Sequence, residues 1–235
     1  MKKKEQWVVS FLEILWVMIL YWVKKEEVDI LKSFIETQQL PSMQVLFQMA
    51  YRTFLAKVNS RETDVSTFNV VARRGTLLEK KTGGTRVHFY NFRTIMDEDT
   101  TFIQGCQQLL NKQNELYRHA DFDPLEMLEM EKKAYGIKQT EWYQGLNMTF
   151  QPVPMMIKEN LKIESRWYSN GAVSSMLYIT IMDGDGSGGL KCYYQYKSNH
   201  ISAEKIKELH ESCVKIMVKG CENPEITLGE LFEEF

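Results

Sequence analysis

The stretch from Asp64 to Arg93 reads DVSTFNVVARRGTLLEKKTGGTRVHFYNFR. Its two ends alternate apolar and polar residues with the two-residue period of a β-strand, and a turn region at Glu79–Gly84 separates them. Polar side chains stand among the β-branched and aromatic residues: Asn69, Arg73, Arg74, Arg86, His88, Asn91 and Arg93. This pattern predicts a pair of strands that lines a polar cavity.

The composition of the 235 residues indicates one large domain or two small ones. Lys and Arg (29) nearly balance Asp and Glu (31), so no overall field favours nucleic acid. The four cysteines lack the short paired spacing of a zinc site and are too few for a disulfide framework. A reducing, cytoplasmic compartment is therefore expected.

The most apolar run of the sequence lies at residues 7–23, between Lys2–Lys4 and Lys24–Lys25. One interpretation is a buried helix, since apolar residues recur there at helical spacing. A membrane span is the less favoured interpretation, because the run is short for a bilayer and carries Glu13 in its middle. A junction at a truncated start is the third. We therefore separate residues 1–25, an apolar amino-terminal helix or junction, from a domain at 26–235.

Periodicity in the remaining sequence alternates between helical and strand-like segments. Helices are predicted over 28–38, 42–58, 102–117, 124–130 and 201–218, the last ending at Gly220, and strands over 146–152, 173–182 and 190–196. His200 and His210 are expected at the exposed start and on the side of the last helix, without function. The fold class is predicted as α+β: a mixed, mostly antiparallel sheet with helices packed on it.

Gly84–Arg93 reads GTRVHFYNFR, and His119–Glu126 reads HADFDPLE. These segments resemble the motifs Gly-x-Phe-Val-Asn-Thr-x-x-x-Arg and His-Gln-Asp-Tyr-Pro-Phe-Glu of the condensation domains of nonribosomal peptide synthetases. Residues 188–196 and Asn223–Leu231 look like the closing strand and the terminal Asn-Pro…Leu-x-Glu-Leu signature. The matches follow the family's order, and together they resemble the carboxy-terminal half of a divergent domain.

The resemblance implies one chloramphenicol acetyltransferase-like half, the acceptor-side wall of a tunnel, at residues 26–235. In the family the other half carries His-His-x-x-x-Asp-Gly, which this sequence lacks. The chain is therefore expected to be inactive alone and to need a partner polypeptide for the catalytic base. Substrates would arrive on the phosphopantetheine of a carrier protein, with no cofactor or metal bound to the chain itself. The residues expected along the tunnel are Arg74, His88, Tyr90, Asn91 and Arg93.

Three alternatives to an enzyme half stay open. The first is a non-catalytic module that binds a carrier protein or an acyl chain. The second is a self-contained enzyme with His88 as general base, for which no oriented carboxylate stands at a recognisable spacing. The third, least favoured by the net charge, is a nucleic-acid surface made by the basic and aromatic residues of 73–92. The run Asp183–Gly189 lacks the spaced carboxylates of a calcium loop and is interpreted as a hairpin turn.

Overall fold

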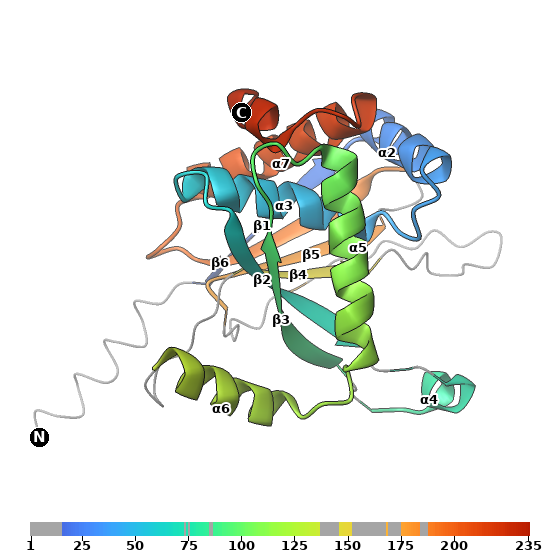
Figure 1. Cartoon of the computed structure of the whole chain (residues 1–235), viewed down its shortest axis with the longest axis vertical. Coiled ribbons are helices and arrows are strands. Elements are labelled where there is room, and N and C mark those ends of the chain that lie inside the picture. Colours follow the sequence, from blue (N-terminus) through green and yellow to red (C-terminus); the bar gives the residue numbers. More distant parts are fainter. Residues whose placement is uncertain are drawn as a thin grey trace, which may run out of the picture.

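A computed structural model describes residues 16–72, 74, 76–84, 87–136, 146–151, 168, 175–183 and 188–235. Helices and strands interleave along the chain without a regular strand-helix-strand repeat (Figure 1). In chain order the elements are β1 (Trp16–Val23), α2 (Lys25–Thr37), α3 (Gln44–Val58), β2 (Asp64–Ala72), α4 (Leu77–Lys81), β3 (Val87–Ile95), α5 (Phe102–Arg118), α6 (Pro124–Tyr135), β4 (Leu146–Gln151), β5 (Leu177–Asp183), β6 (Leu190–Lys197), α7 (Ala203–Glu222) and α8 (Leu228–Glu233).

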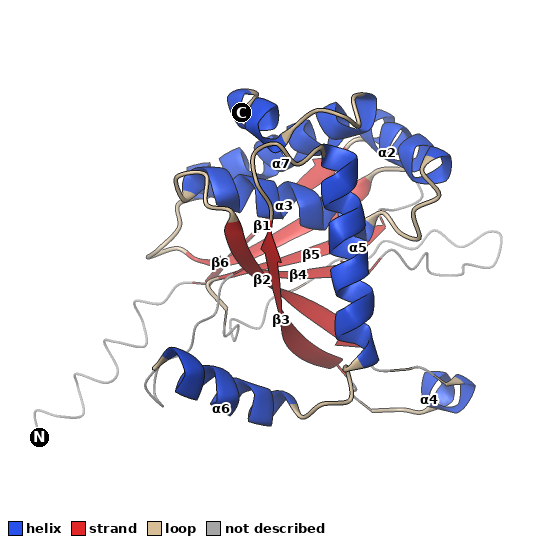
Figure 2. Ribbon diagram, viewed as in Figure 1, coloured by secondary structure: helices blue, strands red, loops and turns tan. Residues whose placement is uncertain are grey.

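The strands form one six-stranded sheet in the order β1-β6-β5-β4-β2-β3. The pairs β1–β6, β5–β6 and β2–β3 are antiparallel, whereas β4 pairs in parallel with both β2 and β5. Helices α2, α3, α5 and α7 lie together on one side of the sheet (Figure 2). The α+β prediction of a mixed, mostly antiparallel sheet with packed helices is therefore confirmed, and so is the strand pair at Asp64–Arg93.

The apolar run near the amino terminus is a strand, not a helix, over Trp16–Val23. Its eight residues pair one-to-one with β6, and the alternate residues Val17, Ile19, Tyr21 and Val23 pack on the core. The run is rich in aromatic and β-branched residues, which favour strands. Because it is apolar at every position, its pattern fits the helical period as well as the strand period, and the pairing with β6 makes it a strand. No described helix is long and apolar enough to cross a bilayer. Residues 7–15 lie outside the described residues.

Helix α3 forms the centre of the helical layer and is buried along nearly its whole length. It contacts α5, α7, α8 and β2, so it joins the helical layer to the sheet. Arg52 projects from it and donates to the carbonyls of Thr63 and Met96 at the ends flanking β2 and β3, and burial lowers the pKa of Arg52 to about 10. This helix therefore fixes the position of the β2–β3 pair.

Two predicted breaks in the chain are corrected by the structure. Helix α7 runs past Gly220 to Glu222. Gly220 does not end the helix but allows close packing, since a Cβ there would overlap the Phe102 ring. The turn predicted at Glu79–Gly84 is helical at its start. The short helix α4 begins at Leu77, is capped at its amino end by Thr76 and ends at Lys81. Strands β5 and β6 pair antiparallel from Asp183 and Leu190, as a hairpin requires, while residues 184–187 lie outside the described residues.

Candidate functional site

The five residues predicted along a cavity occupy three different places, because successive residues of a strand point to opposite faces of a sheet. His88 and Tyr90 of β3 lie on the face covered by the helices, where Phe92 belongs to the core. Asn91 and Arg93 point to the other face, called the outer face below. Arg74 lies beyond the end of β2. His88 and Tyr90 therefore lie on the opposite face of β3 from Asn91, and a role of these residues along a substrate tunnel stays a prediction.

On the helix-covered face, Tyr90 has a structural role. Its hydroxyl donates to the carbonyl of Ala120 at 2.5 Å, just beyond the carboxyl end of α5, and the ring is 3% exposed. The ring of His88 stacks on that of Tyr90 with centroids 6.2 Å apart. These contacts hold β3 against the end of α5.

Arg74 binds the connection between β2 and β3. Its guanidinium donates to the carbonyls of Glu79 at 2.6 Å, of Gly84 at 2.7 Å and of Thr82. Three carbonyls from one short segment use the planar fork that only Arg offers. Arg74 therefore shapes the α4 connection. The three acceptors of these hydrogen bonds do not include any of the other four predicted residues.

Arg93 and Asn91 extend the outer face at the sheet edge. Arg93 makes a bidentate pair with Asp64, Nε to Oδ1 at 2.8 Å and Nη2 to Oδ2 at 2.5 Å, which lowers the pKa of the Asp64 carboxyl. Asn91 donates to the Glu131 carboxylate of α6. Both polar groups are thus held by carboxylates.

The middle of the outer face is a grid of side chains, all polar except Met182, that the sequence pattern did not predict. The register places them in three rows across β4, β5 and β6: Asn147–Tyr178–Gln195, Thr149–Thr180–Tyr193 and Gln151–Met182–Lys191. Phe68 of β2 lies opposite both Asn147 and Asn91, so the first row continues to the predicted residue Asn91. We call the nine residues of the three rows the polar grid.

Most of the polar grid is shielded from water, and two of its polar atoms have no partner. Thr149 and Tyr178 share a hydrogen bond of 2.7 Å between their hydroxyls, and Asn147 donates from its amide to the Ser175 hydroxyl. The Thr180 hydroxyl, in a residue 1% exposed, and the Asn147 carbonyl oxygen have no hydrogen-bond partner in the described part of the chain. Such groups cost free energy unless something bonds them, so they mark the grid as a candidate binding surface.

Aromatic residues border the polar grid at the β1 edge of the sheet. Trp16, Met18, Leu20 and Trp22 form the outer face of β1, opposite Lys197, Gln195, Tyr193 and Lys191. The ammonium groups of Lys191 and Lys197 lie over the Trp22 and Trp16 rings, 5.1 and 5.2 Å from the centroids. A polar centre with an aromatic border suits an extended ligand that carries both amide and apolar groups.

The sequence did contain a signal for the polar grid. Strands β4, β5 and β6 are central or next to central in a sheet, and such strands are usually apolar on both faces when both are covered. Here every second residue is polar, as in Asn147, Thr149 and Gln151, while the alternate residues are core. Polar residues at alternate positions of strands in the middle of a sheet could therefore have predicted a polar outer face.

The described part of the chain holds no cluster of metal-ligating side chains. No three His, Cys, Asp or Glu side chains there could hold a metal ion. His210, expected on the side of α7 and without function, is buried: its Nδ1 lies 2.9 Å from the Tyr194 hydroxyl and its Nε2 3.2 Å from the Trp22 carbonyl. Its position beneath β1, on the helix-covered side, is structural.

Neither a protein-family model nor a curated protein matches the chain. Solved structures do match. The first condensation domain of the CDA synthetase superposes with a TM-score of 0.72 at 14% identity, over 91% of this chain and 47% of that one. The chain has a condensation-domain fold. It spans about half the length of such a domain.

Two further solved structures match the fold of this chain. The X-domain solved in complex with OxyB from teicoplanin biosynthesis gives a TM-score of 0.71 at 14% identity, over 92% of this chain and 48% of that one. A four-domain nonribosomal peptide synthetase bound to AMP and glycine gives 0.77 at 15% identity, over 92% of this chain and 17% of the longer one. The sequence resemblance to condensation domains and the expectation of a half-length fold are thereby confirmed.

Proposed function

We propose that this chain is the acceptor-side half of an acyl- or aminoacyl-transfer unit of the kind that forms peptide bonds in nonribosomal peptide synthesis. The observation that carries the proposal is the extent of the match: the fold covers this chain almost completely but only about half of a condensation domain. The four motifs at Gly84–Arg93 and downstream support the carboxy-terminal half. The other half, with His-His-x-x-x-Asp-Gly, would be supplied by a partner polypeptide.

In this role the polar grid is the wall along which the substrate lies. A substrate on phosphopantetheine is an extended chain with amide groups at intervals, and it needs both donors and acceptors. The Thr180 hydroxyl and the Asn147 carbonyl oxygen, which lack partners, would bond such amides. Shielding from water strengthens each of these bonds, because the local dielectric is low. A carrier protein would deliver the substrate, and the chain itself would bind no cofactor.

His88 does not take the place of the missing base in this proposal. It lies on the helix-covered face of β3, stacked on Tyr90, and therefore on the opposite side of the sheet from the polar grid. In a reconstituted unit His88→Ala should leave the transfer rate within a few-fold of the unchanged chain. Loss of transfer in the reconstituted unit that carries His88→Ala would restore His88 as a catalytic residue.

The first test is the chain alone. With defined donor and acceptor carriers loaded with substrate, we expect no transfer product by intact-mass analysis, because the nine residues of the polar grid include no His, Asp or Glu to act as the base. Product formed by the purified chain would contradict the proposal.

A second candidate function is a non-catalytic module that binds a carrier protein or an acyl chain, and the aromatic border at Trp16 and Trp22 favours it. Calorimetric titration with a carrier in its loaded and unloaded forms tests the binding that both functions share. We expect tighter binding of the loaded form. Absence of binding to either form would argue against both functions, whereas binding without transfer in any reconstituted mixture would favour the module.

A further inference from the structure

Helix α4 holds two neighbouring leucines in the solvent. Leu77 is 77% exposed and Leu78 is 78% exposed, and α4 contributes no buried residue to the core. The helix stands apart from the sheet and from the other helices (Figure 1). A single exposed leucine is ordinary on a protein surface, but adjacent leucines on a projecting connection form an apolar patch of the kind that marks an interaction site.

The two leucines are held in place by bonds within the connection itself. The Thr76 hydroxyl accepts from the backbone N–H of Glu79 at 3.2 Å, and the Glu79 carboxylate accepts from the backbone N–H of Thr76 at 3.0 Å. The Thr82 hydroxyl donates to the carbonyl of Leu78 at 2.7 Å, and the Arg74 guanidinium binds three further carbonyls. A segment fixed in this way loses less entropy when it binds a partner, so the leucines are preorganised for binding.

The exposed side of α4 combines apolar and positive groups. Lys81 follows Leu77 by four residues and Leu78 by three, so the three side chains are neighbours on one side of the helix, while Glu79 is half-buried. Lys80 is exposed as well, and within the part of the chain that the structure describes no ion pair holds either lysine. We call Leu77, Leu78, Lys80 and Lys81 the α4 patch. It is complementary to an apolar surface with negative charge at its border.

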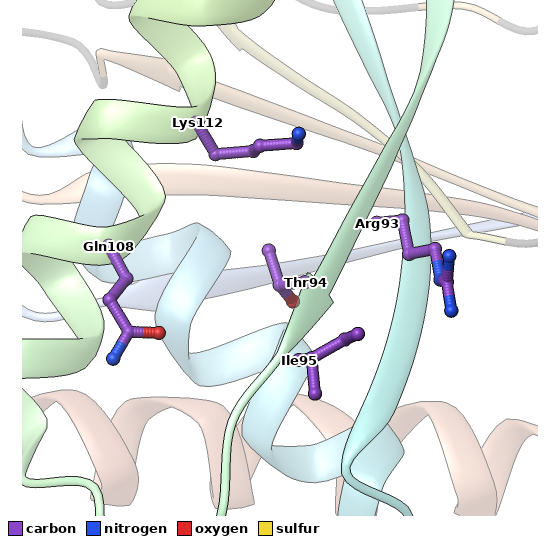
Figure 3. Close-up of a pocket in the computed structure, with 5 residues that line it drawn as sticks. All are labelled: Arg93, Thr94, Ile95, Gln108 and Lys112. Atoms are coloured by element: carbon purple, nitrogen blue, oxygen red, sulfur yellow. The ribbon is translucent and has the colours of Figure 1, made fainter.

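A pocket between β3 and α5 is a second place where cations lie close together, and its charges are already paired (Figure 3). The pocket has a volume of about 320 Å³ and is lined by Arg93, Thr94, Ile95, Gln108 and Lys112. Arg93 pairs with Asp64 at 2.5 Å, and Lys112 pairs with Glu115 at 2.9 Å. An anionic partner is therefore matched better by the α4 patch than by this pocket.

We propose that the α4 patch docks the carrier protein, with the two leucines in an apolar groove of the carrier and the two lysines beside negative groups at the rim of that groove. This inference rests on the proposed function, in which a carrier delivers the substrate. The occupant is a carrier because the phosphate that joins phosphopantetheine to its protein is an anion at the point where the arm leaves toward this chain.

The position of α4 fits this role. The helix joins β2 to β3, and these strands carry Phe68 and Asn91, whose row continues into the polar grid. Phe68 lies four residues before the end of β2, which is a distance of about 13 Å along the strand. A carrier bound at α4 thus lies at one end of the surface along which its arm would extend.

Calorimetric titration of the full chain with a carrier that bears phosphopantetheine without substrate tests the proposal. The double substitution Leu77→Ser and Leu78→Ser should weaken binding by about tenfold or more. It should leave folding intact, because neither side chain is buried. Leu125→Ser is the matched control and should bind like the unchanged chain, since Leu125 is 68% exposed on another helix, α6.

The charge and the support of the α4 patch are tested separately. Lys81→Glu should weaken binding at low salt, and the difference from the unchanged chain should shrink as salt is added. Lys133→Glu, at an exposed lysine of α6, is the control and should have little effect. Arg74→Ala keeps both leucines but removes three of the bonds that hold the connection, so it should also weaken binding.

The outcomes separate this inference from the proposed function. Carrier binding that the serine substitutions leave unchanged would overturn the docking role of α4 while the proposed function stands. No carrier binding by the unchanged chain would overturn both. Leucines beside lysines also suit a membrane surface, so sedimentation with vesicles of phosphatidylserine and phosphatidylcholine is measured too. Vesicle binding that the serine substitutions abolish, with carrier binding intact, would assign α4 to a membrane and overturn the proposal.

Discussion

The buried imidazole of His210 has its proton positions fixed by its neighbours. The Trp22 carbonyl can only accept, so Nε2 of His210 carries the proton, and Nδ1 accepts from the Tyr194 hydroxyl. The Tyr194 oxygen then accepts from the Tyr51 hydroxyl, 3.0 Å away. Burial raises the pKa of both tyrosines well above the usual range, so both keep their protons. The chain of bonds ties β1, β6, α3 and α7 together.

The burial of His210 predicts a loss of stability in mild acid. Burial lowers the pKa of His210, while the hydrogen bond to the Trp22 carbonyl and then the nearby Glu27 and Glu211 oppose the shift more weakly. An unfolded chain, with an imidazole pKa near 6.5, therefore takes up the proton at a higher pH than the folded chain does. The contribution of His210 is complete above about pH 6.5 and falls as the pH drops, by at most about 1.4 kcal/mol per pH unit.

Urea unfolding at pH 7.5 and pH 5 checks the prediction by comparing His210→Gln with the unchanged chain. The variant should be less stable at pH 7.5 and should lose less stability on acidification. His200→Gln, at an exposed position, is the control and should follow the unchanged chain. Equal losses in all three proteins would contradict the prediction.

Two helical glycines should differ in what a methyl group costs. At Gly220 the added Cβ overlaps the rigid Phe102 ring, whereas at Gly105 it meets the flexible end of Met49, with Sδ at 2.8 Å. Alanine gains about 1 kcal/mol of helix propensity at either site, and overpacking of a core typically costs 1–3 kcal/mol. We expect Gly220→Ala to lower the free energy of unfolding by about 1–2 kcal/mol and Gly105→Ala to change it by less. Equal changes in the free energy of unfolding, measured by chemical denaturation, would contradict this expectation and show that the Phe102 ring moves to make room for the methyl group.

Cross-strand partners in the polar grid allow a matched pair of substitutions. Thr149 and Thr180 lie opposite each other, yet only the Thr149 hydroxyl has a partner, Tyr178. Thr149→Val should destabilise the chain by about 1 kcal/mol, while Thr180→Val should leave it as stable or more stable, because a buried hydroxyl without a partner carries a desolvation cost. Thermal unfolding measures both. If the hydroxyl of Thr180 serves a ligand, Thr180→Val should also weaken binding of a loaded carrier.

At the scale of single elements, the α4 connection depends on one side chain. Removal of the Arg74 guanidinium releases three carbonyls between Glu79 and Gly84. Arg74→Ala should therefore speed cleavage after Glu79 by a glutamate-specific protease at least several-fold, with little change in global unfolding, since α4 contributes no buried residue. Lys80→Ala, also in α4, is the control and should leave the cleavage rate near that of the unchanged chain. Unchanged cleavage in Arg74→Ala would mean that the connection holds without these bonds.

Most elements could be predicted from periodicity, and the exceptions have physical reasons. The helices α2, α3, α5 and α7 carry apolar faces at helical spacing and were placed within a few residues. The β1 segment is apolar at every position, so its own pattern fits a helix as well as a strand, and only the partner β6 distinguishes them. Gly220 has the composition of a helix stop but serves close packing, which depends on the distant Phe102.

The candidate site could be predicted only in part. The sequence identified the β2–β3 pair, and Asn91 does lie in a row with the polar grid. Residues adjacent in the sequence were assigned to one cavity, although alternation along β3 sends His88 and Tyr90 to one face and Asn91 to the other. The grid itself depends on the register between β4, β5 and β6, which no single segment encodes.

At the scale of the whole molecule, the two faces of the sheet have different tasks. The helix-covered face carries the core and the His210 network, which hold the chain together. The outer face carries polar groups that the chain leaves partly unbonded, beside an aromatic border. In the proposed function, this half-length condensation fold forms one wall of the substrate tunnel with its outer face, and another polypeptide supplies the opposite wall.

Complementation tests this account most directly. The chain is mixed with a separately expressed amino-terminal condensation half that carries His-His-x-x-x-Asp-Gly, together with loaded donor and acceptor carriers, and the transfer product is followed by intact mass. The account predicts product only when both halves are present, and none when the first His-His pair is replaced by Ala-Ala. Transfer by this chain without the other half would contradict it, and so would a stable complex of the two halves that binds both carriers and forms no product.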